Sequence, residues 1–598
     1  MMLHIIYNIK IMKLRYRILF IAIALIGLSS CSDFLEKVPD TRVYLVNLDQ
    51  LEQLLVTGYT TSNYALVAEM STDNVIDNNS PSDMKGSEGV RYHLSSYEQF
   101  DEQVFAWEDV DLSISGGDTP SGVWSGCYGA IAAANAVLEK IEEFEQTGEI
   151  EGEPISASDR ARMDAIKGEA YMIRAYHHYI LAQIFCMPYR GPEISKTLPG
   201  IPYATKPETK LDPKYDRGTL QETYDNIEAD LQLGLKYVTE DFYEVPKYHF
   251  NIASSNAFAA RFYTVKREYD KVVEYATAAF KGNDPSTMRN DFWDQTDFYY
   301  YSDIARYYSS VERPGNFMMI GTYSTWDRRF YGYRFSCNRD ALRGSIQGPG
   351  PSWENCKWSY RNGKDKVSFS MMPCYQYFCV SAGIEYGSFF VGNCFEQFEY
   401  TDKVAGIGYV HMVRPEFTSQ ETILLRAEAN LFLGNIDAAF EDLYLWNHEH
   451  LLLDESRNGQ MTELTKDQIQ RFYSYYDNPA RRDPGFGIVK QFHIDEVCPS
   501  DKYHLTQEIE PYMQCVQHFR RIQMIHLGNR WFDIKRFGFD VTHKMGISDV
   551  YHLEVLDPRY AIQIPSEVIG AGLDPNTRET VRPENSLVVN KDAFVRVN

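Results

Sequence analysis

Helical periodicity dominates the first half of the printed sequence. Apolar side chains recur at intervals of three and four residues in four stretches, residues 46–61, 122–144, 157–185 and 219–238. This spacing places the apolar side chains on one face of an α-helix. Thr219 and Glu222 have the spacing of a capping box, which marks the start of the fourth stretch. The first half is therefore predicted to consist mainly of long α-helices.

Two later stretches predict pairs of helices joined by short turns. In residues 254–280 and 419–447, alanines occur on both sides of a short break, near residues 267–269 and 433–435. Small side chains let two antiparallel helices approach closely, and the arrangement matches the ~34-residue unit of tetratricopeptide repeats. Generic helical hairpins are the alternative. The two copies lie too far apart for a simple tandem array.

Residues 284–418 have a different pattern. They are rich in aromatic residues, glycine and proline, and show little periodicity. We expect long loops and short strands here, inserted between helical blocks, and loops carry function more often than the scaffold does. The remainder predicts one long helix over 514–538 and a strand-like segment at 560–565. The predicted divisions are a leader, an N-terminal helical region, a loop-rich lobe and a C-terminal helical region, at residues 1–30, 31–283, 284–418 and 419–598.

The leader has the order of a bacterial export signal. A basic segment with Lys13, Arg15 and Arg17 precedes an apolar run, residues 18–28, and two serines then lead to Cys31. The run is shorter than the ~20 residues that span a bilayer. "LSSC" is typical of a lipoprotein signal, in which the Cys31 thiol is diacylated and becomes the first mature residue. The alternatives are cleavage by the general signal peptidase and a buried helix with a chance cysteine. Met12 is an alternative start to Met1.

Composition narrows the classes of partner. The chain has 83 acidic and 59 basic residues and a net charge of −24, which becomes about −28 without the basic leader. Such a charge argues against binding to nucleic acid and to anionic membrane surfaces. Apart from Cys31 there are nine cysteines, an odd number with no CxxC motif. We expect most of them to be small buried residues rather than a disulfide framework or a zinc site.

Catalytic signatures are absent from the sequence. It has no HExxH, Walker A or EF-hand motif, and the serine of "GVWSG" at 122–126 is misplaced for a nucleophile elbow. His177 and His178 are expected to be packing or surface residues of a helix, and "HEH" at 448–450 a solvated helix end. We therefore predict a binding protein with no catalytic residue, metal ion or cofactor. A lipid-anchored hydrolase is the less favoured alternative.

Several segments, in this order along the chain, resemble the SusD/RagB family of outer-membrane lipoproteins of Bacteroidetes. They are the lipobox followed by "CSDFLEKVPD", then "EMSTDNV", "VWSGCYGAIAAANAVLEKI", "KGEAYMIRAYHHYILAQIF", "LLRAEANLFLGN", "GNRWFDIKRFG" and "IQIPSEV". In "GNRWFDIKRFG", Arg530, Asp533 and Arg536 can pair along a helix, so these residues are predicted to be fold markers. The family's C-terminal "QNPGY" is missing, and "GLDPNTRE" stands in its place.

The resemblance implies a fold, a location and a function. It implies a mostly α protein with about four tetratricopeptide-like helix pairs, an irregular loop-rich lobe and short strands. Such proteins are lipid-anchored at the cell surface, cap a SusC-like TonB-dependent transporter, and deliver glycans or, in some members, peptides to it for nutrient uptake. They are not enzymes. Their ligand residues vary, so none is carried over, and the glycan, calcium binding and a peptide ligand stay open.

Candidate ligand residues follow from the aromatic-rich loops instead. Flat sugar faces stack on Trp and Tyr rings, while neighbouring polar groups bind the hydroxyls. The candidates are Trp107, Trp293, Tyr299, Tyr323, Trp326, Arg328, Trp353 and Trp358. Ordinary packing is the alternative for each of them taken singly.

Overall fold

The computed structural model describes most of the chain after residue 44. The described ranges are 45–82, 94–110, 116–209, 214–280, 301–338, 395–450, 463–477 and 487–578, with gaps at 61, 96, 98 and 331–332, together with short pieces at 341, 349–352, 377–378, 390–391 and 584–585. The chain divides into two compact units, residues 1–50 and 51–598. The predicted divisions at 283/284 and 418/419 stay predictions.

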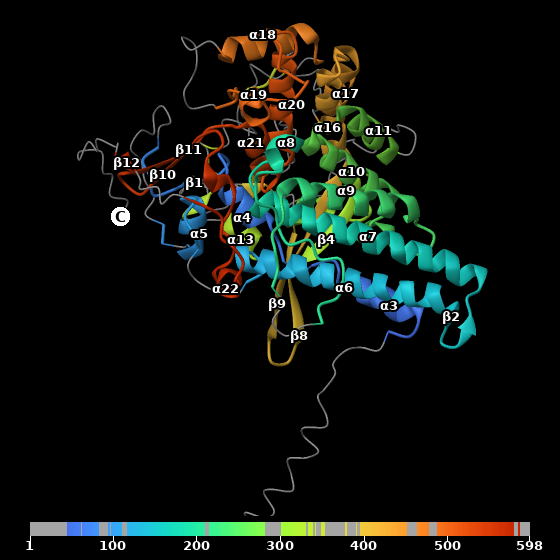
Figure 1. Cartoon of the computed structure of the whole chain (residues 1–598). Helices are drawn as coiled ribbons and strands as arrows, with labels where there is room; N and C mark the ends of the chain where they lie inside the picture. Colours follow the sequence, from blue (N-terminus) through green and yellow to red (C-terminus); the bar gives the residue numbers. More distant parts are fainter. Residues whose placement is uncertain are drawn as a thin grey trace, which may run out of the picture. The chain divides into compact units, whose positions relative to one another are not determined.

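Three long helices form the N-terminal part of the large unit, as predicted: α6 (Pro120–Thr147), α7 (Ala157–Phe185) and α9 (Leu220–Tyr237) (Figure 1). Each begins at a capping side chain, and α9 has the predicted capping box of Thr219 and Glu222. Helix α7 packs against both of the others. Gly168 lets α7 approach α9 closely, since a Cβ at this position would lie 2.7 Å from the carbonyl carbon of Tyr237.

Both predicted helical hairpins are present. Helices α10 (Ile252–Lys266) and α11 (Tyr269–Ala279) pack together, as do α16 (Ser419–Phe432) and α17 (Ile436–His450), and α11 also packs against α16. The turns need left-handed backbone, at Arg267 (φ 61°) and Gly434 (φ 79°). The mostly α fold is thus confirmed, while a tetratricopeptide origin of the hairpins stays a prediction.

The predicted single helix over 514–538 is wrong. The chain forms two helices, α20 (Glu510–Gln523) and α21 (Asn529–Phe537), separated by a sharp turn. His526 (φ 65°) and Gly528 (φ 81°) adopt left-handed conformations in this turn. Their backbone N–H groups donate to the carboxylate of Glu69, 2.8 and 3.2 Å away. A partner more than 450 residues away in sequence therefore breaks the helix.

Shorter helices complete the helical part. They are α3 (Leu48–Val56), α4 (Ala65–Met70), α5 (Gln99–Phe105), α8 (Pro192–Ser195), α12 (Tyr301–Tyr308), α13 (Trp326–Arg329), α18 (Lys466–Asp477), α19 (Ile494–Val497) and α22 (Ser566–Gly570), with the 3₁₀ turns η1 (Pro246–Tyr248) and η5 (Pro558–Tyr560). Within the described ranges, no helix is both long enough and apolar enough to cross a bilayer. Residues 561–565 belong to no strand that the structure describes, and Tyr560 lies in η5, contrary to the strand-like prediction for 560–565.

The strands form small antiparallel sheets. Strand β1 (Ile76–Asp77) pairs with β5 (Phe335–Ser336), β2 (Glu149–Ile150) with β3 (Glu153–Pro154), β6 (Tyr377–Phe378) with β7 (Phe390–Val391), and β11 (Asp549–Leu553) lies between β10 (Val541–Met545) and β12 (Glu584–Asn585). The longest strand, β9 (Ile407–Thr418), lies between β4 (Asn316–Thr322) and β8 (Phe395–Asp402).

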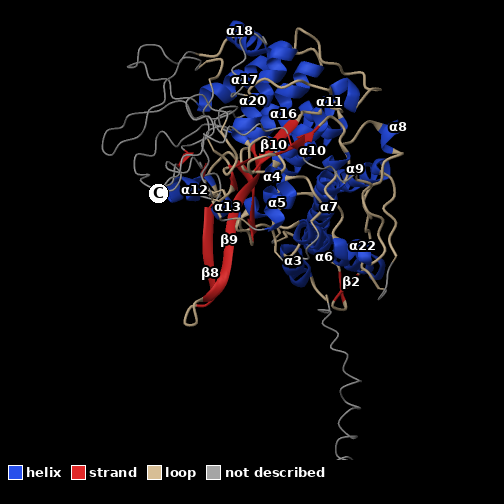
Figure 2. Cartoon of the chain, turned by 90° about the vertical axis from the view of Figure 1, so that its left-hand side faces the viewer, coloured by secondary structure: helices blue, strands red, loops and turns tan. Residues whose placement is uncertain are grey.

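The β8–β9 hairpin is more regular than the predicted loop-rich lobe. Its strands pair in register from Phe395↔Val413 to Asp402↔Ile407, with an irregularity between Tyr400 and Asp402. Figure 2 shows the two strands running past the neighbouring helices to a turn. The end of β9 nearest α16 is buried, whereas the end nearest the turn is exposed. The hairpin is therefore anchored in the core at one end only.

Candidate functional site

Two exposed tyrosines come together beside the hairpin. Tyr323 directly follows β4, and Tyr409 lies in β9. Thr322 pairs with Met412, so alternation along the strands brings both tyrosines to one face of the sheet. Their ring centroids are 5.3 Å apart with an interplanar angle of 38°, and the residues are 43% and 55% exposed. The pair offers solvent a broad aromatic surface.

Polar groups flank this aromatic pair. Glu399 lies opposite Tyr409 in the register, and Gln397 opposite His411. The Nδ1 atom of His411 lies 3.9 Å from a carboxylate oxygen of Glu399. Gly321 leaves room for the imidazole, because a Cβ there would lie 3.1 Å from His411 Nε2. Flat rings beside a carboxylate, an imidazole and an amide suit a ligand with apolar faces and hydroxyl edges.

A second candidate is a polar pocket beside the α16–α17 turn. It has a volume of about 600 Å³. Its polar side chains come from that turn, the start of α17, α18, the segment before α20 and α20 itself, and are Asn435, Asp437, Lys466, Gln470, Glu508 and Tyr512. Lys466 and Asp437 form an ion pair across it. Among the described residues of its lining, only Tyr512 has a ring, and Tyr512 is itself buried. The pocket can therefore bind polar groups but offers no exposed ring for stacking.

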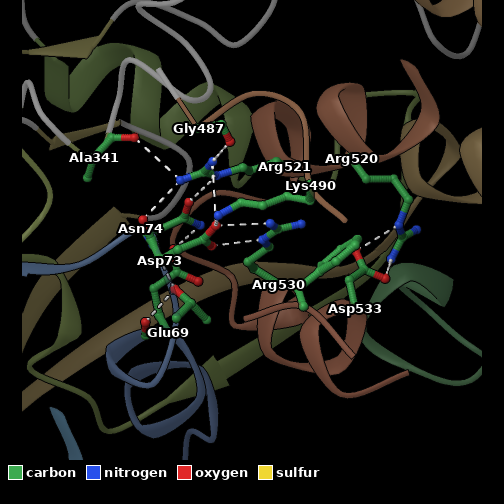
Figure 3. A network of polar contacts seen from close by, with 12 residues as sticks. Glu69, Asp73, Asn74, Ala341, Gly487, Lys490, Arg520, Arg521, Arg530 and Asp533 are labelled. Carbon is green, nitrogen blue, oxygen red and sulfur yellow. Dashed lines mark hydrogen bonds and ion pairs between the residues drawn. The ribbon is translucent and has the colours of Figure 1, made fainter. Parts of the chain in front are cut away.

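A third candidate, a polar cluster around Asp73, joins an early segment of the chain to residues 490–530 (Figure 3). Its carboxylate accepts two hydrogen bonds from Arg530, at 2.9 and 3.0 Å, and pairs with Lys490 at 2.8 Å. Arg521 lies 3.6 Å away and also donates to the Asp73 carbonyl. Burial alone would raise the pKa of Asp73, but these three cations hold it well below its usual range. The cluster is internally paired, which indicates a structural role.

The motif around Asp533 differs partly from its predicted pairing. Asp533 accepts from Arg536 as predicted, at 2.9 Å, and also from Arg520 of α20, at 3.0 and 3.2 Å. Arg530, predicted to pair with Asp533, instead binds Asp73. Arg536 also pairs with Glu428 of α16. These residues join helices to one another, in agreement with their prediction as fold markers.

Glu69 is a second perturbed carboxylate of this region, with its pKa shifted upward. It accepts from the two backbone N–H groups in the α20–α21 turn and from Asn74, at 3.0 Å. Burial nevertheless raises the pKa of Glu69 to about 7. The folded protein therefore binds a proton at this carboxyl group in a pH range where the unfolded chain does not.

This carboxyl group should make stability depend on pH. Because the pKa of Glu69 is raised, its contribution is complete below the unfolded value near 4.5 and is lost as pH rises to about 7. We expect the unfolding free energy to fall relative to Glu69→Gln by up to about 1.4 kcal/mol per pH unit in this range. Urea unfolding at pH 5, 6, 7 and 8 measures it. The exposed control Glu193→Gln should keep the wild-type slope, and equal slopes in wild type and Glu69→Gln would contradict the expectation.

Residues 33–264 match the family model SusD-like_3, described as "Starch-binding associating with outer membrane". These residues belong to the SusD-like family. The resemblance predicted from the sequence is confirmed there, and the part matched includes α4, α6, α7, α9 and most of α10. No curated protein matches the chain.

Solved structures extend the SusD-like fold to nearly the whole chain. A SusD superfamily protein from Bacteroides thetaiotaomicron VPI-5482 is 16% identical with a TM-score of 0.53, over 89% of this chain and 100% of that one. A SusD superfamily protein from Bacteroides fragilis is 14% identical with a TM-score of 0.55, over 88% and 98%. A putative sugar binding protein from Bacteroides vulgatus ATCC 8482 is 15% identical with a TM-score of 0.53, over 88% and 97%. At these identities the similarity shows the fold alone.

Three of the predicted ligand residues have described side chains. Tyr323 lies in the exposed aromatic pair. Trp107 is buried, donates from Nε1 to the Ser71 carbonyl at 3.1 Å and stacks on His543 at 4.2 Å. Trp326 is completely buried against Phe330. Neither tryptophan offers a ring face to a ligand in this structure.

The other predicted site residues lie outside the description. Arg328 belongs to α13, but its side chain is not among those described. The remaining positions, which fall outside the described residues, are Cys31, Trp293, Tyr299, Trp353 and Trp358. The sequence prediction did not include Tyr409. A hairpin signal was present, because polar and aromatic residues alternate from 396 to 400 and glycines follow at 406 and 408.

The remaining candidate chemistry is structural. The two helix histidines are buried, as packing residues, and burial lowers the pKa of His177 to about 4 and that of His178 to about 3. The cysteines with described surroundings are free and buried: Cys127, Cys186, Cys337, Cys498 and Cys515. No group of three metal-ligating side chains occurs among the residues that the structure describes.

Proposed function

We propose that this SusD-like protein binds glycans at the cell surface and delivers them to a SusC-like TonB-dependent transporter in the outer membrane, without catalysing a reaction. A lipid on Cys31 anchors it there. The family description of residues 33–264 names starch binding and association with the outer membrane, and one protein of similar fold is described as sugar binding. Both support this assignment.

The exposed pair of Tyr323 and Tyr409 carries the proposal. Sugar rings have flat C–H faces that stack on aromatic faces and hydroxyl edges that bind polar groups. The paired rings supply the first contact, and Glu399 and His411 lie within reach to supply the second. Both tyrosines are already exposed and in contact, so a ligand can stack without separating them.

Alanine substitutions test this site. Removing either ring, in Tyr323→Ala or Tyr409→Ala, should weaken glycan binding about ten-fold, or about 1.4 kcal/mol, and the double variant should bind more weakly still. Isothermal titration against starch fragments and a panel of other oligosaccharides measures the change.

Tyr248→Ala is the matched control, because Tyr248 is exposed to a similar extent, at 44%, outside this site. It should bind like the wild type. Wild-type affinity in Tyr323→Ala, Tyr409→Ala and the double variant would contradict the site. Binding of a peptide pool in place of every glycan would overturn the proposed ligand class.

A further inference from the structure

The turn of the β8–β9 hairpin presents apolar side chains directly to solvent. Val404 in the turn is 99% exposed, Ile407 at the start of β9 is 60% exposed, and Tyr400 near the end of β8 is 52% exposed. Such side chains usually gather in the interior, and a cluster of exposed ones marks an interaction surface. This cluster lies at the end of the hairpin farthest from the core.

The apolar side chains occupy both faces of the hairpin. Phe398 and Tyr400 lie on one face, with their rings 4.8 Å apart in an edge-to-face contact. Tyr409 and Ile407 lie on the other, because successive residues of a strand alternate between faces. Val404 projects from the turn between them. A folded partner that covers one face leaves the other in water, whereas a fluid lipid layer surrounds both faces and the turn together.

The length of chain before the described region supports a lipid occupant. Cys31, the proposed site of lipidation, precedes the first described residue, Leu45, by fourteen positions. Even fully extended, this segment spans roughly 50 Å. A lipid on Cys31 would therefore hold the beginning of the described chain within that distance of a bilayer.

We propose that the end of this hairpin, residues 400–407, inserts into the interfacial layer of the lipid membrane. The order of side chains agrees with a shallow position: aliphatic residues lie at the turn, Tyr400 and Tyr409 lie behind them, Glu399 is level with Tyr409, and His411 lies farther along. Tyrosine favours the boundary between lipid and water.

The charged residues of the turn limit how deeply the hairpin can insert and which lipid head groups suit it. Asp402 caps the turn, accepting from the N–H groups of Val404 and Ala405 at 2.8 and 3.0 Å. A charge at the interface costs far less than one at the bilayer centre, and Lys403 can extend toward the phosphates. Since residues 396–403 carry three acids and one base, the hairpin fits zwitterionic head groups rather than anionic ones.

The proposal rests on the lipid-anchored location proposed above and adds a second point of contact. Attachment through one lipidated residue leaves the body free to rotate, whereas a second contact sets its orientation. Tyr409 is two residues from Ile407, or about 7 Å along the strand. The aromatic pair would then face the layer just above the membrane surface.

Vesicle binding of the unlipidated protein tests the hairpin separately from the anchor. The chain from residue 31 onward, with Cys31→Ala, is sedimented with phosphatidylcholine vesicles. We expect measurable partitioning that falls about ten-fold or more in Val404→Asp/Ile407→Asp, because two carboxylates replace two apolar side chains at the interface. Val245→Asp, an exposed apolar position outside the hairpin, should partition like the parent. Added phosphatidylglycerol should not strengthen binding.

Each other outcome overturns the proposal. Absence of vesicle binding by the parent excludes insertion, and so does equal binding by the double variant. A concentration-dependent dimer in light scattering, lost in the double variant, would assign the surface to a second copy of the chain. Glycan titration of the same variants should be unchanged, so failure of glycan binding with intact vesicle binding would refute only the proposed function.

Discussion

Replacing Asp73 with asparagine should lower the free energy of unfolding by about 3–5 kcal/mol. The substitution keeps the shape of the side chain but removes the negative charge that Arg530, Arg521 and Lys490 surround. Asparagine also turns an N–H donor toward donors of Arg530. Three cations would then share a largely buried site without the carboxylate that pairs with them. Chemical denaturation at neutral pH, followed by circular dichroism, measures the loss.

A surface pair provides the control for this effect. Asp437→Asn removes the partner of Lys466, but Asp437 is almost fully exposed. Exposed ion pairs contribute only up to about 1 kcal/mol, so this variant should remain close to the wild type. A loss below 1 kcal/mol in Asp73→Asn would show that the cluster around Asp73 does not depend on its charge.

Replacing Cys31 with alanine should abolish attachment to the outer membrane. In the proposed lipoprotein the thiol of Cys31 receives the diacyl lipid, and alanine has no group that can take its place. Two or three acyl chains give stable attachment where one does not. We expect the variant to move from the outer-membrane fraction to the soluble fraction while its far-UV circular dichroism is unchanged. Fractionation followed by immunoblotting measures this.

A second cysteine variant controls for the loss of a thiol. Cys515 is free and buried, and Cys515→Ala should remain in the outer-membrane fraction. Membrane attachment of Cys31→Ala equal to that of the wild type would refute the lipoprotein assignment. The weak partitioning proposed for the hairpin is not expected to retain the protein through washing.

Local signals predicted the helices well, and long-range contacts explain the failures. The capping box of Thr219 and Glu222 and the two helical hairpins were predictable, because the interacting residues are neighbours in sequence. The break between α20 and α21 was not, because its cause, the carboxylate of Glu69, lies in a distant segment.

The candidate site was predicted only in part for a similar reason. Aromatic residue type selected Tyr323, Trp107 and Trp326 equally, whereas exposure to solvent, which separates them, depends on tertiary packing. His543 covers one face of Trp107, for example, and comes from the far end of the chain. The missed partner, Tyr409, needed the hairpin register that places it beside Tyr323.

The ion cluster around Asp73 also has a consequence for when the protein can fold. Asp73 receives its three cations, and Glu69 its two backbone donors, from residues 490–530, more than four hundred positions later in the chain. During synthesis these carboxylates emerge long before those distant cations and backbone donors, and contacts so distant in sequence form slowly. The early helices therefore cannot reach their final packing on an incomplete chain. Such a delay would suit a polypeptide that has to be threaded through a membrane before it becomes compact.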